Sequence, residues 1–337
     1  MAVCGLLAGC AHLEKAPVDP TRSDFLKLIN RPPVALAPQV DKLPGTNGLV
    51  IEHFSFAADA QQRVPGLLVK PWNVTGRKPV VIVLHGTGGN KEGVMPWLTE
   101  LAKRGFVAVA IDGRYHGERT KDGKGTAEYD AAIVQACKDG KEHPFFYDTV
   151  WDVMRLMDYL QTRPDVDGSR IGLTGISKGG VETYLAAAMD PRIAVAAPCI
   201  GMQSFEWALE NNDWQGRIGT VQPAFDEFAK QFGVTQPDSV FVKKFYDRLV
   251  PGIYSEFDGP QLMKEIAPRP LLMVNSDADP HTPLPGVLEC VTAAQEAYAE
   301  AGEPEHFGVR IQEKTGHKVL PDSERAVMDW FVKWLKP

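Results

Sequence analysis

The sequence RIGLTGISKGGVETYLAAAM occupies residues 170–189 and combines two patterns. A short apolar run of strand length ends in GISKG at 175–179, and an apolar segment of helical length follows at 181–189. A strand, a glycine-flanked serine and a helix make up the pattern of a G-x-S-x-G elbow. The flanking glycines are needed because strand and helix approach each other closely at such a turn. The pattern predicts an α/β fold with Ser177 exposed at the carboxyl end of a strand.

Continuous apolar runs of strand length also precede the elbow. Residues 80–84 read VVIVL and end at His85-Gly86, and residues 106–111 read FVAVAI. Such uninterrupted runs are typical of parallel strands covered by helices on both faces. The pattern continues with predicted strands at 193–197, 271–275 and 307–312, and helices at 95–104, 149–162, 287–301 and 324–335. This alternation predicts an α/β, mostly parallel, doubly wound sheet, which begins with an antiparallel pair at 49–56 and 64–70.

Two segments depart from this alternation. Residues 1–48 contain six prolines between 17 and 44, so they are predicted to be a signal-like segment and a Pro-rich arm before one α/β domain at 49–337. Residues from about 201 to 265 carry aromatic helical patterns but no strand run, which predicts a helical cap insertion. Ligands of open α/β sheets bind beyond the carboxyl ends of the strands. We expect most of these aromatic residues to form the core of the cap, with Trp207 and Trp214 as candidates for the pocket.

Composition and charge exclude several classes of function. The 337 residues include 36 basic and 43 acidic side chains, a net charge of −7, and no basic cluster is dense enough to follow a phosphate backbone. Nucleic acid is therefore not expected as a partner. No apolar stretch reaches the ~18 to 20 residues of a transmembrane span. The five cysteines form no C-x-x-C pair, so neither a zinc knuckle nor a thioredoxin-like site is expected.

The amino terminus allows two interpretations. Residues 7–10 read LAGC, which is similar to the processing site of a bacterial lipoprotein, and an apolar stretch precedes them. However, no Lys or Arg comes before that stretch, and it is shorter than most secretory signals. The chain is thus either an exported lipoprotein of the periplasm or outer membrane, with a lipid anchor at Cys10, or a cytoplasmic protein with an apolar tail.

The serine of the elbow needs two partners for chemistry. A serine hydroxyl becomes a nucleophile when a histidine takes its proton, and a carboxylate must orient that histidine. In folds with this elbow the chain order is serine, acid, histidine. Only His281, His306 and His317 follow Ser177. His317 lies in the loop just after the last predicted strand, where the base is expected, and it is our candidate.

The acid is expected in the loop SDADPHTP at 276–283, which follows the preceding strand. Asp279 has a proline four residues later, as in the D-x-x-x-P turn of many such enzymes, which favours Asp279 as the acid. Asp277 is then predicted to cap the turn, although it remains an alternative. The order Asp-x-Asp-x-His also occurs among metal ligands, but this loop offers no complete ligand set and no H-E-x-x-H is present. We therefore expect no metal.

An acyl-transfer site also needs donors for a developing oxyanion. The backbone amide of Lys178, at the start of a helix, and the backbone amide of Thr87, in the glycine-rich loop HGTGG at 85–89, are the candidates. The Lys178 side chain is expected to be solvated. His85, which ends a strand, is expected to bond to loop backbone.

A further polar loop, DGRYHGER at 112–119, follows the strand at 106–111 and should border the same pocket. Its functional interpretation puts Tyr115 or Arg114 in contact with substrate. The alternative is a loop held together by its own Asp–Arg pairing.

Together these residues resemble the α/β-hydrolase superfamily, over about 49–337. More narrowly, DGRYHGER at 112–119, IGMQSF at 200–205 and APRP at 267–270 are similar to dienelactone-hydrolase-like and prolyl-oligopeptidase-like hydrolases. The resemblance implies an α/β-hydrolase fold and serine hydrolysis without a cofactor. Two features depart from those groups. Ser177 stands where dienelactone hydrolases carry cysteine, and the segment before residue 49 is too short for a propeller.

The sequence therefore predicts a serine hydrolase that cleaves a carboxylic ester through an acyl-enzyme, with Ser177, His317 and Asp279 as its triad. A peptidase or amidase with the same triad is the alternative, since both reactions share the acyl-enzyme step. A non-catalytic binding protein on the same fold is a third hypothesis. The expected partner is a small-molecule ester or a peptide.

Overall fold

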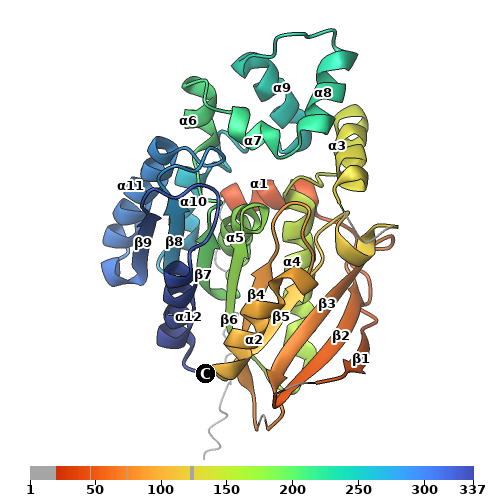
Figure 1. The fold of residues 1–337 in the computed structure, drawn as a ribbon, viewed down its shortest axis with the longest axis vertical. Helices are drawn as coiled ribbons and strands as arrows, with labels where there is room; N and C mark the ends of the chain where they lie inside the picture. The colour runs from red at the N-terminus through yellow and green to blue at the C-terminus, as the bar shows by residue number, and fades with distance from the viewer. Residues whose placement is uncertain (1–19, 46, 74, 122–124) are drawn as a thin grey trace, which may run out of the picture.

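The computed structural model describes residues 20–337 except 46, 74 and 122–124, so Cys10 and the predicted lipid anchor lie outside the described residues. Figure 1 shows a twisted sheet with helices on both faces. The strands are β1 (Gln39–Leu43), β2 (Leu49–Ala57), β3 (Arg63–Pro71), β4 (Lys78–Leu84), β5 (Val107–Ile111), β6 (Val166–Ile176), β7 (Ile193–Cys199), β8 (Leu271–Ser276) and β9 (Phe307–Gln312). The helices are α1 (Pro20–Ile29), α2 (Met95–Lys103), α3 (Ala127–Asp139), α4 (Tyr147–Thr162), α5 (Lys178–Met189), α6 (Phe205–Glu210), α7 (Gln215–Gly219), α8 (Gln222–Gln231), α9 (Ser239–Leu249), α10 (Gly259–Ile266), α11 (Leu284–Glu300) and α12 (Pro321–Leu335). None of these helices is both long and apolar enough to cross a membrane.

The described strands form one sheet in the order β1-β2-β3-β5-β4-β6-β7-β8-β9. The pairs β1–β2, β2–β3 and β3–β5 are antiparallel, and every pair from β5 to β9 is parallel. The prediction of a mostly parallel sheet that begins with an antiparallel pair is confirmed. All strands of the parallel part end at the same edge of the sheet, where the loops after β4, β6, β8 and β9 meet.

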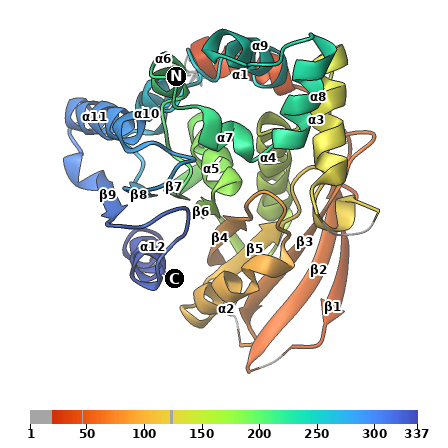
Figure 2. The same cartoon turned by 45° about the horizontal axis from the view of Figure 1, so that its top comes forward.

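Successive side chains of the central strand β4 explain why both faces are covered. Val80, Ile82 and Leu84 belong to a core shared with α4, α5 and α11, whereas Val81 and Val83 belong to a second core shared with α2 and α12. Figure 2 shows α2 and α12 on one side of the sheet and α4, α5 and α10 on the other. Because strand side chains alternate between faces, a continuous apolar run such as β4 requires helices on both.

Five helices, α6 to α10, connect β7 to β8 in the segment for which the sequence predicts a cap insertion. Figures 1 and 2 show α7, α8 and α9 beyond the carboxyl ends of the strands. Phe225, Phe228, Phe241 and Phe245 pack there as a ring cluster, with centroids 5.2 to 5.7 Å apart. Helix α3, which the sequence did not indicate, packs against α8 and α9. The exact division of the chain into arm, domain and cap stays a prediction.

Part of the predicted Pro-rich arm is packed against the domain. Helix α1 lies against α4 and α5 and buries Phe25 and Ile29. Just after it, Arg31 forms ion pairs with Asp59 and Asp148. Strand β1 adds an edge to the sheet, and all five of its residues are exposed. The sequence did not indicate β1, because a strand without a buried face carries no hydrophobic alternation.

Candidate active site

Ser177 stands at the elbow between β6 and α5 with backbone angles φ 59° and ψ −115°. The two glycines of the motif are required by contact. A Cβ on Gly175 would lie 2.3 Å from the carbonyl oxygen of Gly179, and a Cβ on Gly179 would lie 2.5 Å from that of Leu84. A positive φ at a serine is a strained conformation that the surrounding structure must impose. The elbow thus places Ser177 at the carboxyl end of β6, where the sequence predicts it, but the residue is only 8% exposed and not the exposed serine that the sequence predicts.

The loops after β8 and β9 bring two further side chains to Ser177. The Nε2 atom of His317 lies 2.7 Å from Ser177 Oγ, and its Nδ1 atom lies 2.7 Å from Asp279 Oδ2. A carboxylate only accepts, so Nδ1 carries the proton and leaves Nε2 as the acceptor for the serine hydroxyl. These three residues, 140 positions apart at the extremes, form one hydrogen-bonded chain.

Asp279 is almost fully buried, and its surroundings favour the ionised form. It accepts hydrogen bonds from the amide of His281 at 2.9 Å and from the hydroxyl of Thr282 at 3.0 Å, besides that of His317. Burial alone would raise the pKa of Asp279, but these donors and the nearby imidazole hold the pKa below its usual value. Asp279 therefore remains a carboxylate throughout the neutral pH range.

Asp277, the alternative acid, makes no bond to His317. Its carboxylate accepts the backbone amides of Lys314 at 2.9 Å and Thr315 at 3.1 Å. These two amides belong to the loop that carries His317. Asp277 thus caps that loop, which is the role the sequence suggested for it beside Asp279.

The candidate oxyanion donors lie close to Ser177, one next to it in the chain and one in the loop after β4. Lys178 is the first residue of α5, and amides of a first helical turn have no partner within the helix. A Cβ built on Gly86 would lie 3.4 Å from Cβ of Ser177, so the loop after β4 lies directly against the serine. Thr87, the next residue of that loop, lines the same pocket. That these two amides bind an oxyanion stays a prediction.

His85 has the structural place that the sequence suggested. Its Nδ1 lies 2.8 Å from the carbonyl oxygen of Gly86, and its Nε2 accepts the amide of Gly113 at 3.0 Å. Burial, and then the charge of Lys178, lower the pKa of His85 to about 4. The neutral ring ties the loop after β4 to the loop after β5.

Ser177 and His317 open into a pocket of about 430 Å³. Besides the loop after β4, it is lined by Ile176, Ile200, Gly219, Thr220, His281 and Lys318. Gly219 and Thr220 come from the end of α7, so a cap helix forms one wall. Ile176 and Ile200 are the only aliphatic side chains among the described lining residues, and six of the ten are polar.

The side chain of Lys178 corrects one expectation. It is not solvated: it is 1% exposed, and its Nζ forms an ion pair with Glu182 one helical turn further on. Nζ also lies 5.7 Å from the ring centroid of Tyr129 on α3. The sequence could not indicate this burial, because it depends on α3 and the loop after β5 covering the first turn of α5.

This buried pair supports a stability prediction. Lys178→Met should destabilise the protein by about 3 kcal/mol, because it leaves Glu182 buried without its partner. The double variant Lys178→Met/Glu182→Gln should lose less than this. Lys230→Met, which removes an exposed lysine of α8, should change the unfolding free energy by less than about 0.5 kcal/mol. Urea unfolding measures all three, and equal effects of Lys178→Met and Lys230→Met would contradict the prediction.

The structure does not place the three candidate pocket residues Tyr115, Trp207 and Trp214 in the lining of this pocket. Trp207 packs on α11 near Gly286, and the Trp214 ring packs on Phe225. The hydroxyl of Tyr115 bonds to Glu142. None of the three tryptophan and tyrosine side chains is among the described residues that line the pocket.

Arg114 is buried and bound to carboxylates from other parts of the chain. Its guanidinium bonds to Asp152 of α4 at 3.1 Å and to Asp59 at 3.0 Å. Asp112, in turn, accepts the amide and the ammonium group of Lys91. The loop at 112–119 is thus held mainly by long-range ion pairs, and within the loop Arg119 also donates to the carbonyl oxygen of Asp112 at 3.2 Å.

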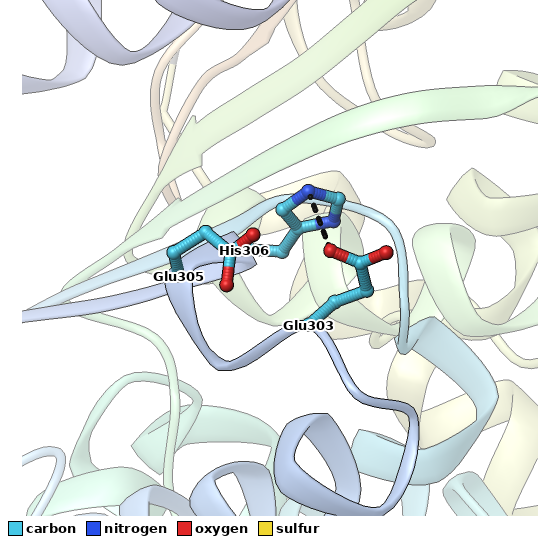
Figure 3. Close-up of side chains that lie close together, drawn as sticks. All are labelled: Glu303, Glu305 and His306. Carbon is cyan, nitrogen blue, oxygen red and sulfur yellow. Dashed lines mark ion pairs between the residues drawn. The ribbon is translucent and has the colours of Figure 1, made fainter.

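One cluster of ligand-type side chains lies elsewhere in the described residues. Glu303, Glu305 and His306 approach one another near the start of β9, as Figure 3 shows. The two ring nitrogens of His306 already face the carbonyl oxygen of Pro268 at 2.7 Å and Glu303 at 3.5 Å. The cluster precedes β9, so it lies at the opposite edge of the sheet from Ser177 and has no part in this site.

Comparison with known proteins identifies the family to which the chain belongs. The model of the acetyl xylan esterase (AXE1) family matches residues 45–213, half of the chain, which includes the elbow and the loop after β4. The chain belongs to the acetyl xylan esterase (AXE1) family. A second model, of fungal glucuronyl esterases, matches residues 138–302. The protein is thus a serine carboxylic ester hydrolase, as the sequence predicts.

Individual relatives of this AXE1-family esterase are distant. It is 24% identical to YtaP of Bacillus subtilis over 85% of this chain and 88% of that protein. It is 24% identical to the acetyl esterase Axe7A of Xylanibacter ruminicola over 56% of this chain and 42% of that protein. The crystal structure of acetyl xylan esterase 1 from Thermoanaerobacterium sp. superposes with a TM-score of 0.71 at 19% identity, covering 95% of each chain. This likeness confirms the α/β-hydrolase fold.

Sequence reasoning missed several pocket residues of the esterase. The sequence analysis names His281 as a candidate base and in a possible metal-ligand pattern but not as a pocket residue, although it follows Asp279 by two positions in a loop already assigned to the site. Ile200, which follows β7, could have been found by the same rule that placed the other loops at the carboxyl edge. Thr220 gave no signal, because its place depends on how α7 folds back over the sheet.

Proposed function

We propose that this esterase removes acetyl groups from hydroxyl-rich compounds such as carbohydrates, with Ser177, His317 and Asp279 as its catalytic triad. The hydrogen-bonded chain of these three residues at the mouth of a pocket is the observation that carries the proposal. Membership of the acetyl xylan esterase family supports the acetyl group as the acyl part.

In the proposed mechanism Ser177 Oγ attacks the ester carbonyl carbon while His317 Nε2 takes the hydroxyl proton. The negative charge moves to the carbonyl oxygen, where the amides of Lys178 and Thr87 stabilise it. The ionised Asp279 stabilises the imidazolium and holds its orientation. Collapse of the tetrahedral intermediate breaks the ester bond, and His317 gives its proton to the departing alcohol oxygen. Water then attacks the acetyl-serine by the same steps, which releases acetate and restores the Ser177 hydroxyl.

The pocket lining supports a short acyl group and a polar alcohol. Ile176 and Ile200 are the two aliphatic residues of the described lining, and Ile176 precedes Ser177 directly in the chain. A long acyl chain needs an extended apolar groove to recover its hydrophobic free energy, at about 0.8 kcal/mol for each buried CH₂ group. Thr87, Thr220 and His281 offer hydrogen-bonding groups instead.

Turnover of a graded ester series tests this proposal. For 4-nitrophenyl esters from acetate to octanoate, kcat/KM should be highest for acetate and fall at least tenfold by hexanoate, and acetylated xylose should be deacetylated. A peptide anilide should not be cleaved, which separates the esterase from the peptidase alternative. Faster turnover of octanoate than of acetate, or turnover of the methyl ester of glucuronic acid with none of acetate esters, would contradict the acetyl assignment.

A further inference from the structure

His281 lies in the pocket beside the imidazole of His317. The two ring centroids are 4.4 Å apart, and the ring planes are almost perpendicular at 89°. His281 belongs to the loop of Asp279 and lines the same pocket as Ser177. The mechanism above gives it no task, so its own hydrogen-bonding state decides what it offers to a substrate.

The bond to α7 fixes which ring nitrogen of His281 carries the proton. Nδ1 lies 2.6 Å from the carbonyl oxygen of Gly216, and a carbonyl oxygen only accepts, so Nδ1 donates. Burial lowers the pKa of His281, despite this carbonyl, and favours the neutral ring at neutral pH. In a neutral ring with Nδ1 protonated, Nε2 is an acceptor. Within the described residues Nε2 has no hydrogen-bond partner.

The backbone of Pro280 and His281 is held in place by α7 and by Gln203. A Cβ on Gly216 would lie 1.8 Å from the carbonyl oxygen of Pro280, so only glycine permits this contact. The Gln203 amide, oriented to satisfy both neighbours, donates to the carbonyl oxygen of His281 at 2.7 Å and accepts from Arg217 Nε at 3.1 Å. Because the backbone, the Nδ1 bond and the contact with the His317 ring all hold His281, its ring has a fixed position, which is what selective recognition requires.

The reaction itself tells which part of the substrate meets His281. His317 Nε2 protonates the departing alcohol oxygen, so the alcohol part of the ester lies on the His317 side of Ser177. The oxyanion lies on the other side, near the amides of Lys178 and Thr87. Because the His281 ring packs against His317, it faces the alcohol part of the substrate and not the acyl part.

We propose that Nε2 of His281 accepts a hydrogen bond from a free hydroxyl group next to the esterified oxygen, and so selects esters of polyols over esters of simple alcohols. The inference rests on the proposed function, because it assigns the alcohol that this site receives. His281 is then a specificity-determining residue. A single hydrogen bond of this kind is worth about tenfold in selectivity.

The test compares two substrates that differ by one hydroxyl group: methyl 2-O-acetyl-β-xylopyranoside and its 3-deoxy analogue. The wild-type protein should prefer the hydroxyl-bearing ester by about tenfold in kcat/KM. His281→Asn keeps a donor for the Gly216 carbonyl but loses the acceptor at Nε2, so its ratio should fall towards one. His281→Gln can place an amide oxygen near the position of Nε2, so it should restore part of the ratio.

The outcomes separate the two proposals. A wild-type ratio near one with turnover of both esters, or an unchanged ratio in His281→Asn, would overturn the role of His281 and leave the acetyl esterase intact. Turnover of neither sugar ester by a wild-type protein that hydrolyses other esters would overturn the proposed function, and the role of His281 with it. Because the readout is a ratio within each variant, a general loss of folded protein does not alter it.

Discussion

Ser177→Ala should lower kcat for acetate esters by a factor of about 10⁵ while the protein stays folded. This substitution removes only the hydroxyl group. The elbow keeps its glycines and the oxyanion amides, so a small residual rate should remain. Labelling by a fluorophosphonate probe should disappear in the same variant. Steady-state kinetics, labelling and the melting temperature together measure the effect.

Ser169→Ala is the matched control for that variant. Ser169 is an exposed serine on β6, the strand that leads to the elbow, but it lies at the opposite end of the strand. Its replacement should leave labelling and kcat unchanged. Labelling that persists in Ser177→Ala, or turnover within tenfold of the wild type, would show that another group is the nucleophile.

Asp279→Asn should lower kcat by about 10³- to 10⁴-fold, with little change in KM. An asparagine amide can donate to Nδ1 of His317, which would move the imidazole proton to Nε2 and remove the acceptor that Ser177 needs. Asp277→Asn should change kcat less than tenfold, because Asp277 touches only the backbone of the His317 loop. Initial rates with 4-nitrophenyl acetate compare the two variants directly.

The pH dependence of the unfolding free energy gives a second way to test the role of Asp279. The pKa of Asp279 is lowered in the folded protein, so its carboxylate stabilises the fold above the ordinary pKa of about 4. That contribution is lost as the pH falls through the lowered pKa. The stability difference between the wild type and Asp279→Asn should therefore be full at pH 7 and shrink below about pH 4. A larger catalytic loss in Asp277→Asn than in Asp279→Asn would reverse the assignment of the acid.

The parts of the fold that the sequence predicts are those with local signals. The strand at 80–84 and the elbow at 175–179 are readable because burial on both faces leaves an uninterrupted apolar run, and because close contact leaves glycines. Ser177, Asp279 and His317 each follow a predicted parallel strand, and the carboxyl ends of parallel strands lie at one end of the sheet. The sequence could therefore predict that these three residues lie close together, but not the distances between their atoms.

The parts that the sequence did not indicate depend on contacts between distant segments. Whether Lys178 is solvated or buried is decided by Tyr129, about fifty positions earlier, and Arg114 is bound to Asp59 and Asp152 on either side of it in the chain. Nε2 of His281 is an acceptor because Nδ1 donates to the carbonyl oxygen of Gly216 in the cap helix α7. No periodicity within a short window encodes such pairings.

The close packing of Gly216 on Pro280 has a consequence for how selection operates. Helix α7 is one wall of the pocket and packs closely on the loop that holds Asp279, so the wall and this loop form one contacting unit. An alcohol group too bulky for the pocket would push this unit outward and tilt the carboxylate away from the imidazole. Such a substrate would be penalised in the rate of turnover as well as in affinity, so discrimination would continue after binding.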